Sequence, residues 1–252
     1  MIDRWIARPM SAGTTGDEGR DMHDGHGSTN QTANEHGGRT RRQRFAGWCR
    51  RRAVLLIPAA LVIYGGVLLA QPPSVTDLSR KSAESVPALL SAWQEGHVIV
   101  VLRHLERCDR ADSPCLDGQE KGVTERAVAG GRELGKRFDR LGLANADILN
   151  SPLARTAQTS QILFNRAEYD QDWLNGCRKQ MLDSMMQRKV SGRNLILVTH
   201  SGCMEALQQE LGFGDDIPDY GRALFISAPP ASSRPLMLGF LDMDDWDSTP
   251  GL

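Results

Sequence analysis

Five side chains that can bind or transfer an anionic group stand just after apolar stretches of this chain of 252 residues. They are Arg103, His104, Arg107, Arg155 and His200. Arginine forks match phosphate oxygens two at a time and stay charged at any working pH. A neutral imidazole is a nucleophile toward phosphorus. Because arginines without carboxylate partners repel one another unless an anion lies between them, the set predicts a pocket for a phosphoryl group.

Three segments carry these side chains, and the pattern of each predicts an apolar strand followed by polar residues. They are VIVVL followed by RHLER at 98–107, ADIL followed by NSPLARTAQTS at 146–160, and NLILVT followed by HSG at 194–202. Ligands of open α/β sheets bind beyond the carboxyl ends of the strands, so the three strand ends should converge. Helices expected to begin near Leu153 and Gly202 would add N–H groups and a favourable dipole for an anion.

Strand and helix patterns alternate from residue 78 onward. Strands are expected at 98–102, 146–149, 194–199, 223–227 and 236–241. Helices are expected at 78–95, 124–141, 153–164, 173–189 and 202–211. This alternation predicts an α/β domain with a mostly parallel sheet that helices cover on both faces.

The motifs RHLER at 103–107, SPLARTAQTS at 151–160 and VTHSG at 198–202 resemble the histidine phosphatase superfamily, the phosphoglycerate-mutase-like fold. The resemblance covers roughly residues 96–241. It implies a three-layer sandwich with a central sheet between helices, and catalysis that needs no cofactor and no metal. It also implies that His104 is the phosphorylated nucleophile and that the phosphate is bound by the remaining four residues, namely Arg103, Arg107, Arg155 and His200.

A longer signature, RHLERCD at 103–109, is similar to that of the bacterial periplasmic phosphatases of lipopolysaccharide core heptose phosphate. Two features depart from the superfamily pattern. Leu105 stands where glycine is usual, and it would crowd or reshape the pocket. The general acid that protonates the leaving group has no clear motif. Glu168, Asp170 and Asp172 are candidates, and we favour Asp172.

The N-terminal part has a different composition. Residues 1–40 are rich in Gly, Thr, Asp and His without apolar periodicity, which favours disorder. A basic segment at 41–52 precedes 18 residues without charge, Ala53 to Ala70, which are just long enough to cross a bilayer. Positive charge on that flank keeps the N-terminus cytoplasmic, so a linker at 71–77 and the domain at 78–252 should be exported. The apolar segment is an uncleaved signal anchor, which we favour, or a signal peptide cleaved after Ala70.

Four cysteines follow the apolar segment, an even number for an oxidising compartment. Cys108 and Cys115 lie seven positions apart and suit a local disulfide, which leaves Cys177 to pair with Cys203. Four buried thiols are the alternative. A zinc site is disfavoured, because no close Cys-x-x-Cys pair occurs.

The net charge of −1 and the 24% of charged residues give no indication of a nucleic-acid partner. The sequence predicts a phosphomonoesterase that forms a phosphohistidine. Its substrate would be a phosphorylated small molecule or glycolipid. The protein would lie in the inner membrane with its catalytic domain in the periplasm, or be free in the periplasm if cleaved. The alternatives are a phosphomutase and a phospholigand-binding module without catalysis.

Overall fold

The structure is a computed structural model, and part of the chain lies outside the residues that it describes. It describes 71–80, 82–166, 171–177, 180–214, 216–230, 234–249, 251–252 and seven residues between 56 and 65. The predicted tail at 1–40, the basic segment at 41–52 and most of the apolar segment at 53–70 lie outside these residues. Within the described residues, no helix has the length and apolar character needed to cross a membrane.

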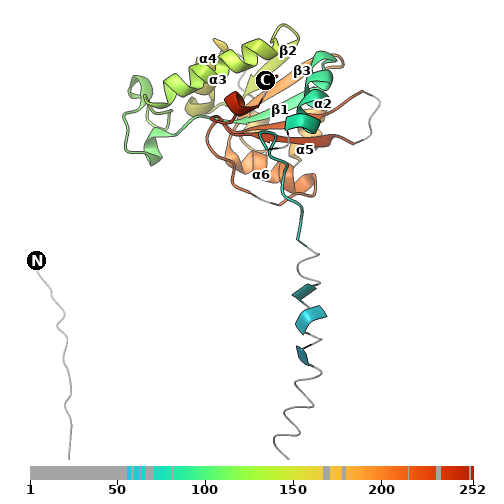
Figure 1. Cartoon of the computed structure of the whole chain (residues 1–252). Coiled ribbons are helices and arrows are strands. Elements are labelled where there is room, and N and C mark those ends of the chain that lie inside the picture. Colours follow the sequence, from blue (N-terminus) through green and yellow to red (C-terminus); the bar gives the residue numbers. More distant parts are fainter. Residues whose placement is uncertain are drawn as a thin grey trace, which may run out of the picture. The chain divides into compact units, whose positions relative to one another are not determined.

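A five-stranded sheet in the order β2-β3-β1-β4-β5 forms the centre of the domain (Figure 1). The strands are β1 (Val98–Arg103), β2 (Ala146–Asn150), β3 (Asn194–Thr199), β4 (Ala223–Ser227) and β5 (Leu236–Leu241). β3 runs parallel to both β1 and β2. β4 runs antiparallel to both β1 and β5.

The α/β class is confirmed, but the expectation of a mostly parallel sheet is wrong. Two of the four strand pairings are antiparallel. The reason lies in the connection that precedes β4. It returns the chain to the carboxyl end of β1, where Arg103 N donates to Arg222 O over 2.9 Å. A strand that begins at this end must run back along β1, and the short link to β5 allows only a second antiparallel neighbour.

Helices cover both faces of the sheet. They are α2 (Ser82–Gln94), α3 (Ala127–Leu141), α4 (Ala154–Phe164), α5 (Met181–Arg188) and α6 (Ser201–Glu210). Alternate residues of β1 enter two separate cores, as the period of a strand requires. Val100 packs in the core that α2, α3 and α4 share, and Val101 packs in the core beneath α5 and α6. The predicted layers of helix, sheet and helix are therefore present (Figure 1).

One predicted helix is absent. The continuous helix expected at 173–189 is wrong, because a short 3-10 helix, Asp172–Leu174, and the separate α5 occupy this stretch. Gln180, just before α5, has a left-handed backbone with φ of 72°, which a continuous right-handed helix does not allow.

Both predicted disulfides are confirmed. Cys108 is bonded to Cys115, with Cα atoms 5.0 Å apart, and Cys177 is bonded to Cys203, with Cα atoms 5.4 Å apart. The first closes a loop after β1. The second ties the start of α6 to the segment that follows the Asp172–Leu174 turn.

Helix α3 approaches α4 closely because it carries glycines on the contacting face. A Cβ at Gly135 would collide with the backbone carbonyl of Leu163 in α4. A Cβ at Gly131 would lie 2.5 Å from Cδ1 of Leu105, the residue after His104. The packing of these two helices is thus coupled to the end of β1.

We predict that Gly135→Ala lowers the free energy of unfolding by about 2 kcal/mol, because a backbone atom cannot give way to the new methyl group. Gly130→Ala in the same helix is the matched control. Its Cβ would meet only the flexible side chain of Met243, at 3.2 Å, so the helix propensity of alanine should leave stability unchanged or raised by up to about 1 kcal/mol. Denaturant unfolding measures both. Equal effects of the two substitutions would contradict this account of the helix contact.

Candidate active site

The ends of β1, β2 and β3 meet as predicted. β1 and β3 are parallel neighbours with Arg103 opposite Thr199, and the next residue continues this pairing, since His104 N donates to Thr199 O over 2.9 Å. After β2, Ser151 N donates to Val198 O over 3.0 Å. Helix α4 begins soon afterwards, so Arg155 stands in its first turn.

His104 is buried, with 2% of its surface exposed. Its Nδ1 lies 2.6 Å from the carbonyl oxygen of Leu105, and its Nε2 lies 3.1 Å from Nε of Arg155. A carbonyl only accepts and an arginine N–H only donates. The imidazole is therefore neutral, with its proton on Nδ1 and its lone pair on Nε2.

The electrostatic surroundings favour the same neutral form. The pKa of His104 is lowered from 6.5 to about 3, mainly by burial and also by the charges of Arg155, Arg103 and His200. The hydrogen bond to Leu105 acts in the opposite direction. At neutral pH the Nε2 atom is thus unprotonated, as attack on phosphorus would require.

Leu105 does not crowd the site, although glycine is usual at this position in the resembling family. Its side chain is 1% exposed and belongs to the core shared by α3 and α4. Its backbone N–H donates to Oγ1 of Thr159 over 3.0 Å. The larger residue fits because Gly131 of α3 has no side chain at that point.

Arg103 is half-buried beside His104. Its guanidinium carbon lies 4.0 Å from the centre of the Tyr220 ring, and one terminal N–H donates to the carbonyl of Pro218. Its Nε atom is buried without a hydrogen-bond partner among the described residues. Burial lowers the pKa of Arg103, while Tyr220, Asp219 and Glu205 oppose that shift. A buried donor without a partner suits an anionic ligand.

Tyr220 is a site residue that the sequence reasoning missed. Its ring lies over the guanidinium of Arg103, with its centre 5.6 Å from that of the His104 ring. It directly precedes the segment that pairs with the end of β1. Its position becomes visible only once β4 is known to run antiparallel to β1, because the residues before β4 then reach the carboxyl end of β1.

Arg107 lies near the site but is held by a carboxylate. Its Nε donates to Oδ1 of Asp109 over 2.8 Å. Arg107 and Arg110 both lower the pKa of Arg155, after the larger effect of burial, and Asp109 opposes them. Arg107 is thus close enough to Arg155 to change its pKa, and Asp109 partly offsets the positive charges around Arg155. Glu106 instead pairs with the exposed Arg126.

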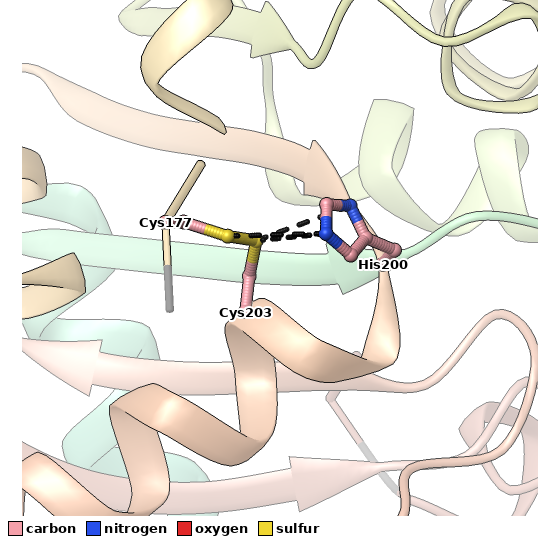
Figure 2. Close-up of side chains that lie close together, drawn as sticks. All are labelled: Cys177, His200 and Cys203. Carbon is pink, nitrogen blue, oxygen red and sulfur yellow. Dashed lines mark hydrogen bonds between the residues drawn. A yellow bond between two sulfur atoms is a disulfide. The ribbon is translucent and has the colours of Figure 1, made fainter. Parts of the chain in front are cut away.

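His200 ends β3 and precedes α6. Its Nε2 lies 3.4 Å from Sγ of Cys203 and 3.9 Å from Sγ of Cys177. Figure 2 shows the imidazole facing the two bonded sulfur atoms. Of the described residues, these three alone combine His, Cys, Asp or Glu ligand atoms in a cluster compact enough for a metal. The disulfide bond already engages both sulfurs.

Asp172 is the first residue of the short 3-10 helix Asp172–Leu174. Its side chain is exposed, and no hydrogen bond or ion pair joins it to the other predicted site residues in the described part of the chain. The neighbouring Gln171 N donates to Asn150 O at the end of β2, over 2.9 Å. Glu168 and Asp170, the other candidates for the acid, lie outside the described residues.

No family model matches the chain. Curated relatives from Salmonella paratyphi B and Salmonella typhimurium are both named lipopolysaccharide core heptose(II)-phosphate phosphatase. Each is 26% identical over 192 residues, which span 71% of this chain and 88% of the relative.

Two solved structures are also similar to this chain. A protein histidine phosphatase, SixA, complexed with tungstate has a TM-score of 0.46 and 13% identity, over 58% of this chain and 97% of its own. A phosphoglycerate mutase from Bacillus anthracis has a TM-score of 0.43 and 11% identity, over 62% and 98%. Scores at this level add no weight to a functional assignment.

We predict that acid destabilises the wild-type protein more than His104→Gln. The folded-state pKa of His104 lies below 6.5, so between about pH 6 and pH 4 the unfolded chain binds a proton that the folded chain excludes. The unfolding free energy of the wild type should therefore fall relative to the variant by up to about 1.4 kcal/mol per pH unit. Denaturant unfolding across this range measures the difference. Parallel curves for the two proteins would contradict a neutral, buried His104.

Proposed function

We propose that this chain, whose motifs resemble those of the histidine phosphatase superfamily, is a phosphomonoesterase that works through a phosphorylated His104. The observation that carries the proposal is the state of the His104 ring. Its Nδ1 proton is engaged by the carbonyl of Leu105, and its Nε2 lone pair faces a cationic side chain. This arrangement suits attack on a bound phosphoryl group.

Arg155 and Arg103 bind the phosphate in this proposal. Nε of Arg155 donates to the Nε2 lone pair that His104 needs for attack. A phosphate dianion is a stronger acceptor than imidazole, so the guanidinium turns to the phosphate and frees Nε2. The unpartnered Nε of Arg103 supplies a second donor. His200, which lies at the start of α6, would share the charge that develops on the phosphate oxygens.

The reaction would proceed in two steps. Nε2 attacks phosphorus, a bond between nitrogen and phosphorus forms, and the bond from phosphorus to the alcohol oxygen breaks. The departing oxygen takes a proton from a general acid. A water molecule then attacks phosphorus and passes its proton to that group, and the bond to nitrogen breaks as phosphate leaves. Throughout, Nδ1 keeps its proton and its hydrogen bond to Leu105, which stabilises the positive ring of the intermediate.

Arg107 would add a third positive charge at the rim of the phosphate site. The contact with Asp109 holds its guanidinium in one orientation, and its effect on the pKa of Arg155 supports a place within electrostatic reach of the phosphate. Asp172 is our proposal for the general acid. It rests on the position of this residue after β2, where the backbone of Gln171 is bound to Asn150.

We further propose a phosphorylated sugar of the lipopolysaccharide core as the substrate. The printed name of the curated relatives supports this choice, as does the signature RHLERCD at 103–109. Such a substrate requires the domain to act in the periplasm. The domain would be held at the inner membrane by the apolar segment at 53–70, or be free in the periplasm if that segment is removed.

We predict that His104→Gln lowers kcat/KM for a phosphomonoester by more than about 10³-fold, because the nucleophile is lost. His97→Gln is the matched control. His97 is paired with Glu95 at the opposite end of β1, so this variant should keep wild-type kinetics. Release of inorganic phosphate from p-nitrophenyl phosphate and from a heptose phosphate measures both. Near wild-type turnover by His104→Gln would remove His104 from the mechanism.

The same assay tests the general acid. Asp172→Asn should slow the heptose phosphate, whose alcohol leaves poorly without a proton, far more than p-nitrophenyl phosphate, whose phenolate leaves easily. Equal effects on the two substrates would show that Asp172 does not protonate the leaving group.

A further inference from the structure

We propose that Cys177, Cys203 and His200 form a binding site for a thiophilic divalent cation, such as Zn²⁺, whenever the Cys177–Cys203 disulfide is open. The three residues come from separate positions around the start of α6. Cys203 lies in its first turn, His200 lies just before it, and Cys177 follows the Asp172–Leu174 turn. Figure 2 shows their ligand atoms converging, and all lie within 4.8 Å of one another.

The distances suit a tetrahedral metal centre. Zinc binds thiolate sulfur at about 2.3 Å and imidazole nitrogen at about 2.0–2.1 Å, so a nitrogen and a sulfur on the same ion lie roughly 3.6 Å apart. In this structure Nε2 of His200 is 3.4 Å from one sulfur and 3.9 Å from the other. The nitrogen therefore needs only small movements. The sulfurs must separate once their bond is broken, which the Cα spacing of 5.4 Å allows.

The surroundings also favour a soft cation. Both cysteines are buried, at 3% and 0% exposure, so a bound ion would be shielded from water. Nδ1 of His200 lies 3.4 Å from Oγ1 of Thr199, a neighbour that can orient the ring while Nε2 binds the metal. Three protein ligands leave a fourth position open, as in a Cys₂His zinc site.

The dithiol form arises in two ways. A newly made chain has it before the disulfide closes, and a dithiol reductant regenerates it by thiol exchange. In the exchange the reductant is oxidised to its disulfide, and the two protein sulfurs gain two electrons and two protons. Binding of the cation then releases the two thiol protons, since thiolates are the ligands. Metal and oxidation thus compete for the same two sulfurs.

The binding site would also control the phosphatase, and this consequence rests on the proposed function. A cation on Nε2 of His200 withdraws that ring from the phosphate. The reduced enzyme should therefore lose activity when Zn²⁺ is added and recover it with a chelator, whereas the oxidised enzyme should be indifferent to Zn²⁺.

Cobalt binding tests the site without any assay of turnover. The full chain carrying Cys49→Ser is reduced with a phosphine, and Co²⁺ is added after removal of the reductant. We expect one cobalt per chain and the charge-transfer absorption of two thiolates. The double variant Cys108→Ser/Cys115→Ser should behave identically, because that pair has no part in the site. The double variant Cys177→Ser/Cys203→Ser should lose the absorption, and His200→Ala should weaken binding by at least about 10-fold.

Three results would overturn the site. They are cobalt absorption that survives in Cys177→Ser/Cys203→Ser, an unchanged affinity in His200→Ala, and loss of the folded circular dichroism spectrum on reduction. If cobalt binds as expected but Zn²⁺ does not inhibit the reduced enzyme, the binding site stands. In that event the role of His200 in phosphate binding is what fails.

Discussion

The burial of a neutral imidazole at the end of β1 is the constraint on which the rest of this site depends. His104 stays unprotonated because water is excluded and because the surrounding groups are cationic. The carbonyl of Leu105 accepts from Nδ1 and so selects the tautomer protonated there, and Nε of Arg155 donates to the lone pair on Nε2. A phosphoryl group that enters would satisfy the arginines and meet the nucleophile in a single place.

The fold supports this arrangement from several directions. Parallel pairing with β3 places Thr199 and His200 beside Arg103 and His104. The α3–α4 contact, made close by Gly131 and Gly135, gives Leu105 its place in the core. The Cys177–Cys203 disulfide lies against the ring of His200 and joins the start of α6 to the preceding segment. Core packing and covalent bonds thus orient the side chains of the candidate site.

The sequence was sufficient to predict the structure where the apolar pattern of a segment and the chemistry of its residues agree. The buried strands Val98–Arg103 and Asn194–Thr199 are continuous apolar runs, and the polar residues that follow them do converge. The Cys108–Cys115 disulfide followed from cysteine spacing, and Cys177–Cys203 followed as the pair that remained. The direction of β4 could not be read from its residues, because an apolar strand has the same composition in either direction. Tyr220 was missed for that reason.

The left-handed backbone at Gln180, which divides the predicted helix at 173–189, also could not be predicted from the sequence. Arg107 was expected at the phosphate, and the structure shows it in contact with Asp109.

The central claim is that His104 itself carries the phosphoryl group. The most direct measurement is to mix the full chain with a phosphorus-labelled phosphomonoester, quench at alkaline pH, where phosphohistidine survives, and locate the label by peptide mass spectrometry. We expect phosphate on the peptide that contains His104, and none in His104→Gln. Phosphate release without label on this peptide, or label on another residue, would contradict the account.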